Sequence, residues 1–255
     1  MKCVNCNQAL APQYRYCPVC SQTANVQRIT LAEVSHQAVH YFHADKSIFS
    51  LVRDLATKSG TVAREYVMGM RKKYYSPLNF FLMVAAVYLL AMNLEQSPAS
   101  QALRERPALA ELAEGEDLAK LERFYQRQEV AVKFMQKRSN IIAMVTLPVS
   151  ALIFFLFYRK REFNYTEHLV ASMYMAGFST LVYTVLILLN ILVNAPVGVL
   201  AATYFLFQIL YYAWFYFRFM DGTGKLRATV AAACGALAPG AVGAILILLY
   251  TFDFI

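Results

Sequence analysis

The sequence predicts an all-α polytopic membrane protein of about five transmembrane helices, with a small N-terminal cysteine-rich ribbon and amphipathic interfacial helices. Of its 255 residues, 58% are hydrophobic and only 16% are charged, and the mean hydropathy is +0.41. Soluble domains are about 45–50% apolar and about one quarter charged. The excess of apolar residues falls in five long runs, which indicates transmembrane helices rather than one large soluble core.

The five apolar runs are each close to the length that crosses a bilayer core, about 20 residues for ~30 Å of hydrocarbon. They are Pro77–Leu94, Asn140–Tyr158, His168–Asn194, Val197–Met220 and Ala228–Phe252. Pro148 predicts a kink in the second run, and the glycines of the fifth, with alanines between them, predict close helix–helix contact (Gly235, Gly240 and Gly243). We therefore expect a transmembrane domain over residues 77–255, with residues 95–139 as a polar extracytoplasmic insert.

Four of the five cysteines form two Cys-x-x-Cys pairs, Cys3 with Cys6 and Cys17 with Cys20. Two such pairs can complete a closed tetrahedral Zn²⁺ site. A segment with so little core needs a metal to fold, so we predict a structural zinc ribbon over residues 1–25. Two disulfides are the alternative interpretation, which requires an oxidising compartment.

The next segment, residues 28–76, is predicted to form amphipathic helices at the membrane interface, and we call it the collar. Thr30 and Glu33 have the spacing of a capping box at the start of a helix. The three expected helices cover 31–42, 46–56 and 62–70. Ser59-Gly60 is expected to end the second helix, with Gly60 in a positive-φ conformation.

Three histidines in the first collar helix are candidate metal ligands. His36, His40 and His43 lie at i, i+4 and i+7, so that they share one helix face. Asp45 follows, and His168 at the mouth of the third span could join them in a speculative second metal site or a proton-responsive patch. The alternative is that the rings pack at the membrane interface and that Asp45 caps the next helix.

A run of cations and tyrosines precedes the first span. It consists of Arg71, Lys72, Lys73, Tyr74 and Tyr75. Basic and aromatic residues are enriched where a helix enters the headgroup region, so we predict that these five side chains contact lipid. Ser76 and Pro77 then have the pattern of an N-cap and a first helical residue.

Several of these elements resemble a known family. His43-Ala44-Asp45-Lys46, the G-x-x-x-R-E-Y stretch at 60–66 and the R-K-x-Y-x-x-P entry at 71–77 are similar to the bacterial family of unknown function 3667. The resemblance covers about residues 1–90. It implies a zinc ribbon joined to a multi-span membrane domain, and it implies no activity.

The distribution of charge predicts the orientation. With the N-terminus inside, the inner segments hold 16 basic and seven acidic residues, whereas the outer segments hold eight basic and nine acidic residues. The positive-inside rule then predicts a cytoplasmic N-terminus and an outside C-terminus in a bacterial inner membrane. The first residues lack the apolar core of a signal peptide. The net charge of +8 is thus explained by orientation and lipid contact, and no nucleic-acid partner is expected.

The sequence favours a non-enzymatic membrane protein whose ribbon and collar bind a cytoplasmic protein partner or lipid headgroups. It contains no Walker A loop, G-x-S-x-G, H-E-x-x-H or Rossmann glycine pattern. Five spans without an evident repeat suit a module that forms homo-oligomers. The alternatives are a small transporter or channel for a neutral or lipidic substrate, and an interfacial metalloenzyme that uses the His36, His40 and His43 face.

Overall fold

Most of the described part of the chain is helical. The computed structural model describes residues 1–34, 48–94, 127, 130, 139–193, 195–222 and 224–251. Its helices are α2 (Ile48–Thr57), α3 (Gly60–Val67), α4 (Pro77–Leu94), α7 (Ser139–Tyr158), α8 (Tyr165–Val193), α9 (Val197–Phe219) and α10 (Lys225–Thr251). The described residues contain two isolated β-bridges and no strand. The predicted all-α fold class is confirmed.

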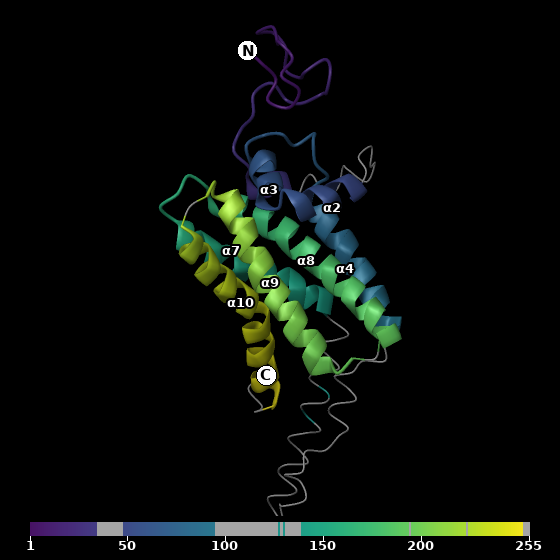
Figure 1. The fold of residues 1–255 in the computed structure, drawn as a ribbon. Coiled ribbons are helices and arrows are strands. Elements are labelled where there is room, and N and C mark those ends of the chain that lie inside the picture. The colour runs from purple at the N-terminus through teal and green to yellow at the C-terminus, as the bar shows by residue number, and fades with distance from the viewer. Residues whose placement is uncertain are drawn as a thin grey trace, which may run out of the picture.

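The five apolar helices form one bundle, with α8 at its centre (Figure 1). α8 packs against α4, α7 and α9, while α10 closes the bundle against α9 and α7. Each predicted span coincides with one of these helices to within three residues at either end. Large apolar side chains remain exposed on the outer faces, among them Leu192, Leu206 and Leu210. Exposed leucines in this number suit a lipid environment.

Three of these helices are long and apolar enough to cross a membrane, namely Tyr165–Val193, Gly198–Phe219 and Lys225–Gly243. Two shorter apolar helices, Pro77–Met92 and Val145–Tyr158, stand beside them. The composition and the bundle together fit a helical membrane protein. Whether all five helices cross the bilayer stays a prediction.

The fifth span contacts its neighbour closely at one of the predicted glycines. A Cβ at Gly235 would lie 2.6 Å from the ring of Phe154 on α7, which is too close for a side chain. Gly240, in contrast, has nothing within 4 Å of its Cβ position. The prediction of close contact is therefore confirmed at Gly235, whereas no such contact is seen at Gly240 among the described residues.

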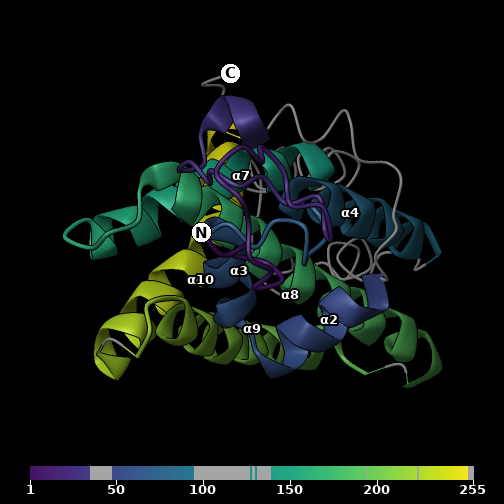
Figure 2. The same ribbon diagram turned by 90° about the horizontal axis from the view of Figure 1, so that it is seen from above.

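The two short helices of the collar lie across one end of the bundle (Figures 1 and 2). α3 contacts α8 and α9, and α2 contacts α3 and α8. The predicted amphipathic stripe of α2 is present, since Leu51 and Leu55 are buried while Arg53 on the opposite face is exposed. The ribbon and the α7–α8 and α9–α10 connections lie at this same end, and the last described residues of α10 lie at the other (Figure 1).

Candidate metal centre and its attachment to the bundle

The ribbon is built from two copies of one turn, fourteen residues apart. In the first copy, the Cys3 N–H donates to the Gln8 carbonyl and the Asn7 N–H donates to the Cys3 carbonyl, both at 2.9 Å. The second copy repeats both bonds at 2.8 Å, from Cys17 to Gln22 and from Ser21 to Cys17. Asn7 and Ser21 both have a positive φ, 60° and 57°. Each turn thus points two sulfur atoms toward the same centre.

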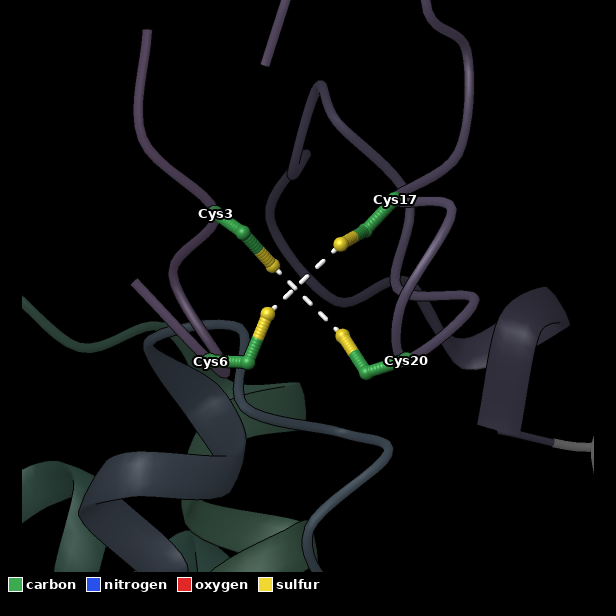
Figure 3. Close-up of side chains that lie close together, drawn as sticks. All are labelled: Cys3, Cys6, Cys17 and Cys20. Atoms are coloured by element: carbon green, nitrogen blue, oxygen red, sulfur yellow. Dashed lines mark hydrogen bonds between the residues drawn. The ribbon is translucent and has the colours of Figure 1, made fainter. Parts of the chain in front are cut away.

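The four sulfurs converge on one point between the two turns (Figure 3). The Sγ atoms of Cys3 and Cys20 are 3.6 Å apart, those of Cys6 and Cys17 are 3.5 Å apart, and all four lie within 4.8 Å of one another. A disulfide bond would bring two sulfurs to about 2.05 Å, and all four thiols are free. The arrangement can hold a metal ion, and the disulfide alternative is not the one seen.

The thiols differ in acidity because they share one centre. Burial opposes ionisation of the Cys20 thiol, but hydrogen bonds from Asn5, from the Gln22 backbone and from neighbouring thiols lower its pKa to about 6. The Gln8 backbone favours the Cys6 thiolate, yet desolvation and the other three thiols raise the pKa of Cys6 to about 12. Four thiolates need a cation between them, so metal binding here releases protons.

A short connection, Gln22 to Ile29, attaches the ribbon to the collar, and we call it the strap. The Gln22 side-chain oxygen accepts the Lys72 backbone N–H at 3.2 Å, while the Gln22 backbone carbonyl belongs to the second cysteine turn. Arg71 donates to the Gln27 carbonyl at 2.6 Å and forms an ion pair with Glu33. One residue of the strap therefore joins the metal-binding turn directly to the backbone that enters the first span.

The strap is also fixed to the first turn of α8. Arg28 forms an ion pair with Glu167 at 3.5 Å and donates to the Glu162 carbonyl. Glu167 is buried and belongs to a capping box, because its carboxylate accepts the Asn164 N–H at 2.7 Å while the Asn164 side chain accepts the Glu167 N–H at 2.9 Å. A carboxylate held in this way gives Arg28 a rigid partner.

The predicted capping box of the first collar helix is only half formed. The Thr30 hydroxyl accepts the Glu33 N–H at 3.3 Å, as expected. The Glu33 carboxylate forms an ion pair with Arg71, and a return bond to the Thr30 N–H is not seen among the described contacts.

The connection between α2 and α3 corrects the expectation about Gly60. The Thr61 N–H donates to the Lys58 carbonyl across a four-residue turn, and the positive φ belongs to Ser59 (φ 49°, ψ −125°). These angles are those of a type II′ turn at a position that favours glycine. Gly60 itself starts α3, where a Cβ would lie 1.9 Å from the Phe215 carbonyl oxygen. Glycine is needed there for close approach of α3 to α9.

The polar residues of α3 make specific contacts. Arg64 donates to the Phe219 carbonyl at the end of α9 (3.3 Å) and forms ion pairs with Asp221 (3.2 Å) and, more weakly, Glu162 (4.0 Å). This guanidinium therefore occupies the carbonyl end of a membrane helix, where a cation is favourable.

The Tyr74 hydroxyl donates to Glu65 at 2.7 Å, and Lys73 pairs with the same carboxylate. Tyr66 packs edge-to-face on Tyr174 of α8, with ring centroids 5.7 Å apart. Together these contacts join α3 to the entry of α4 and to α8.

One family matches part of this chain. Residues 45–89 match the family described as protein of unknown function (DUF3667). The predicted resemblance is thus confirmed over that segment, which covers the collar from Asp45 onward and most of α4, and which does not include the ribbon. No curated protein and no solved structure matches the chain.

The matched segment contains the contacts just described. Its G-x-x-x-R-E-Y stretch supplies the close approach at Gly60, the α9 cap at Arg64, the acceptor for Tyr74 at Glu65 and the ring at Tyr66. These residues hold α3 on the end of the bundle. The motif therefore has a structural basis in this chain.

The remaining predicted site residues stand as follows. His36, His40, His43 and Asp45 lie outside the described residues, so the second metal site stays a prediction. His168 is fully buried in α8, where its Nδ1 lies 3.4 Å from the Tyr216 hydroxyl and its ring stacks on those of Tyr158 and Tyr216.

Of the five predicted lipid contacts, Arg71 and Tyr74 are turned toward the protein, whereas Lys73 is exposed. Ser76 does not act as an N-cap, because its buried hydroxyl has no hydrogen-bond partner in the part of the chain that the structure describes. Pro77 is the first residue of α4, as expected. Lipid contact by the five side chains stays a prediction.

Proposed function

We propose that this chain is an integral protein of a bacterial inner membrane that displays a zinc ribbon on the cytoplasmic side, where the ribbon binds a protein partner and the collar contacts lipid headgroups. The observation that carries this proposal is the strap. Its contacts with Lys72, Arg71 and Glu167 hold the ribbon at a fixed position on the end of the bundle. A ribbon that is held in one orientation presents the same surface to a partner at all times, which suits a binding role.

Zinc is the metal that best fits the four thiols. With Zn–S bonds of ~2.3 Å, a tetrahedral site places its sulfurs about 3.8 Å apart, and the observed 3.5 and 3.6 Å lie close to that value. Four sulfur ligands leave no coordination position for water, so the ion would stabilise the ribbon and take no part in a reaction.

Elemental analysis of the purified protein tests the metal. We expect one zinc per chain, lost in Cys17→Ser and retained in Cys234→Ser, which removes the cysteine outside the cluster. More than one metal per chain would instead support the histidine site, and retention of zinc by Cys17→Ser would contradict the four-thiol assignment.

The ribbon surface supports a protein partner. Five large apolar side chains are exposed on it, namely Met1, Val4, Tyr14, Tyr16 and Val19, and the last two are 61% and 67% exposed. Tyrosine is enriched in interface cores, and residues 1–32 contain no acidic side chain. A complementary partner would present an apolar surface with acidic groups around it.

The positive-inside rule supports the cytoplasmic orientation. The segments with excess positive charge are the ribbon, the collar and the α7–α8 and α9–α10 connections. Ion pairs join these segments at one end of the bundle: Arg28 pairs with Glu167, and Arg64 pairs with Glu162 and Asp221. A strong excess of basic residues in the predicted inner segments, and no such excess in the predicted outer segments, is the pattern that the rule describes.

Site-specific photocrosslinking in native membranes tests the docking function. A photoreactive amino acid at Val19 should give a discrete protein adduct, and the adduct should disappear when Cys17→Ser is added. The same amino acid at Leu206, which is exposed on α9, should not give that adduct. If Val19 yields only lipid adducts, or the same adducts as Leu206, a protein-docking role for the ribbon is wrong.

A further inference from the structure

A pocket of about 360 Å³ lies between α3 and the end of α9. Its walls include Arg64, Glu65 and Met68 from the collar side and Phe217, Arg218 and Asp221 from the α9 side. The pocket lies where a membrane helix ends, next to the helix that crosses the bundle end. That is the depth at which lipid headgroups meet a membrane protein.

One cation that lines the pocket, Arg218, has no acidic partner within the described residues. Arg64 is paired with Asp221, and Glu65 is paired with Lys73. Arg218 is exposed and forms no ion pair within the part of the chain that the structure describes. The four charged side chains that line the pocket, two arginines and two carboxylates, sum to zero, but the Arg218 guanidinium stays available to pair with the single negative charge of a phosphodiester.

The pocket wall also has an apolar part. Met68 is 46% exposed and Phe217 is partly exposed, and both line the same space as the charged groups. A soluble phosphate compound has no apolar carbons to place against this wall, whereas the glycerol and first acyl carbons of a lipid would cover it. The combination of one spare cation and an apolar wall favours a lipid over a soluble anion.

We propose that this pocket binds the headgroup of an anionic phospholipid. The phosphodiester lies between Arg218 and Arg64, and the glycerol backbone lies against Met68 and Phe217. The bound lipid would brace α3 against α9, because each helix contributes one arginine to the same phosphate. This proposal deepens the lipid-contact part of the proposed function and rests on it, whereas the protein partner of the ribbon plays no role.

Native mass spectrometry of the delipidated full-length protein tests the pocket, with phosphatidylglycerol as the probe. Arg218→Gln should reduce phosphatidylglycerol binding about fivefold, the order expected for one cation beside an anionic headgroup. Arg159→Gln removes an exposed cation from the same end of the bundle but outside the pocket, and it should leave binding unchanged. Equal losses in both variants would show only general attraction to the basic end and would overturn the site.

Two further measurements separate a lipid from a soluble ligand. Phe217→Ser should weaken phosphatidylglycerol binding, and millimolar glycerol phosphate should not displace the lipid. Displacement by glycerol phosphate would assign the pocket to a soluble phosphate compound and overturn the lipid proposal. These measurements use isolated protein, so failure to bind lipid would not affect the Val19 crosslinking result. Failure of the Val19 crosslink would likewise not affect the lipid-binding result.

Discussion

Two neighbouring residues, Ser59 and Gly60, have exchanged the roles that a sequence pattern assigns to them. The positive φ lies at Ser59, a residue with a Cβ, and the glycine lies where another backbone comes too near for any side chain. A residue other than glycine in this conformation costs roughly 1 kcal/mol or more. The strain at Ser59 is therefore the consequence of docking α3 directly on α9.

Substitutions at these two positions should have opposite effects. Ser59→Gly relieves the backbone strain and should stabilise the protein by about 1 kcal/mol, less the entropy that glycine adds to the unfolded chain. Gly60→Ala forces a Cβ against the Phe215 carbonyl and should destabilise the protein by about 1–3 kcal/mol. The measurement is the unfolding midpoint in a denaturing-detergent titration.

Ser59→Ala is the matched control, since it keeps the positive φ and should not stabilise. Stabilisation by Ser59→Ala equal to that by Ser59→Gly would show that the side chain, and not the backbone, determines the effect.

At the scale of elements, α3 joins the collar to the bundle, and Glu65 is the residue through which it contacts the entry of α4. Partial burial raises the pKa of Glu65, but hydrogen bonds from Lys73 and Tyr74 lower it below the ordinary value of 4.5. The same contact works on the partner: burial, and then the bond to Glu65, raise the pKa of Tyr74 above its ordinary value. A lowered pKa for Glu65 and a raised pKa for Tyr74 are both expected when an ionised carboxylate accepts a hydrogen bond from a neutral phenol.

The sign of the pH dependence follows from the lowered pKa of Glu65. Its contribution to stability is complete above about pH 4.5 and is lost as the pH falls through the lower pKa of the folded state. When the pH is lowered below 4.5, we expect the detergent concentration at the unfolding midpoint to decrease in the wild type. The decrease should be smaller in Glu65→Gln, which is destabilised already at pH 7. An equal acid loss in both proteins would assign the effect to other carboxylates.

Much of the element order could be predicted from the sequence, and much of the pairing between elements could not. Five apolar runs predict five helices because hydrophobicity is a local property of the chain. Arg71 and Tyr74 show the limit: a basic and aromatic run is typical of a lipid interface, yet their partners Glu33 and Glu65 are brought near by the fold. A local sequence pattern does not predict which distant residues a side chain contacts in the folded protein.

The ribbon contains a sequence repeat as well as its cysteine spacing. The cysteine spacing predicts four converging thiols, and the sulfurs do converge. The repeat at fourteen residues is also visible in the sequence, since Gln8 and Gln22 each follow the second cysteine of a pair by two residues. That repeat would have predicted equivalent turns. The second role of Gln22, as the acceptor for the Lys72 N–H, depends on the fold alone.

At the scale of the whole molecule, the bundle has a ribbon end and an opposite end, and the described helices alternate between them. The chain enters α4 at the ribbon end, returns there through the α7–α8 and α9–α10 connections, and leaves through α10 at the opposite end (Figure 1). An odd number of crossings places the two termini on opposite sides of a bilayer. The positive-inside rule then predicts that the ribbon end is the inner one.

A reporter that fluoresces only in the cytoplasm tests this arrangement. Fused before Met1 it should give a strong signal, and fused after Ile255 it should stay silent, while a reporter active only outside should give the reverse pattern. The prediction is sensitive to the two shorter apolar helices, Pro77–Met92 and Val145–Tyr158. If either of these two helices fails to cross, the number of crossings becomes even and the C-terminal reporter becomes bright. Neutralising Arg159, Lys160 and Arg161 in the wild-type background should raise the misoriented fraction, because the positive-inside rule predicts that these cations keep the α7–α8 connection on the inner side.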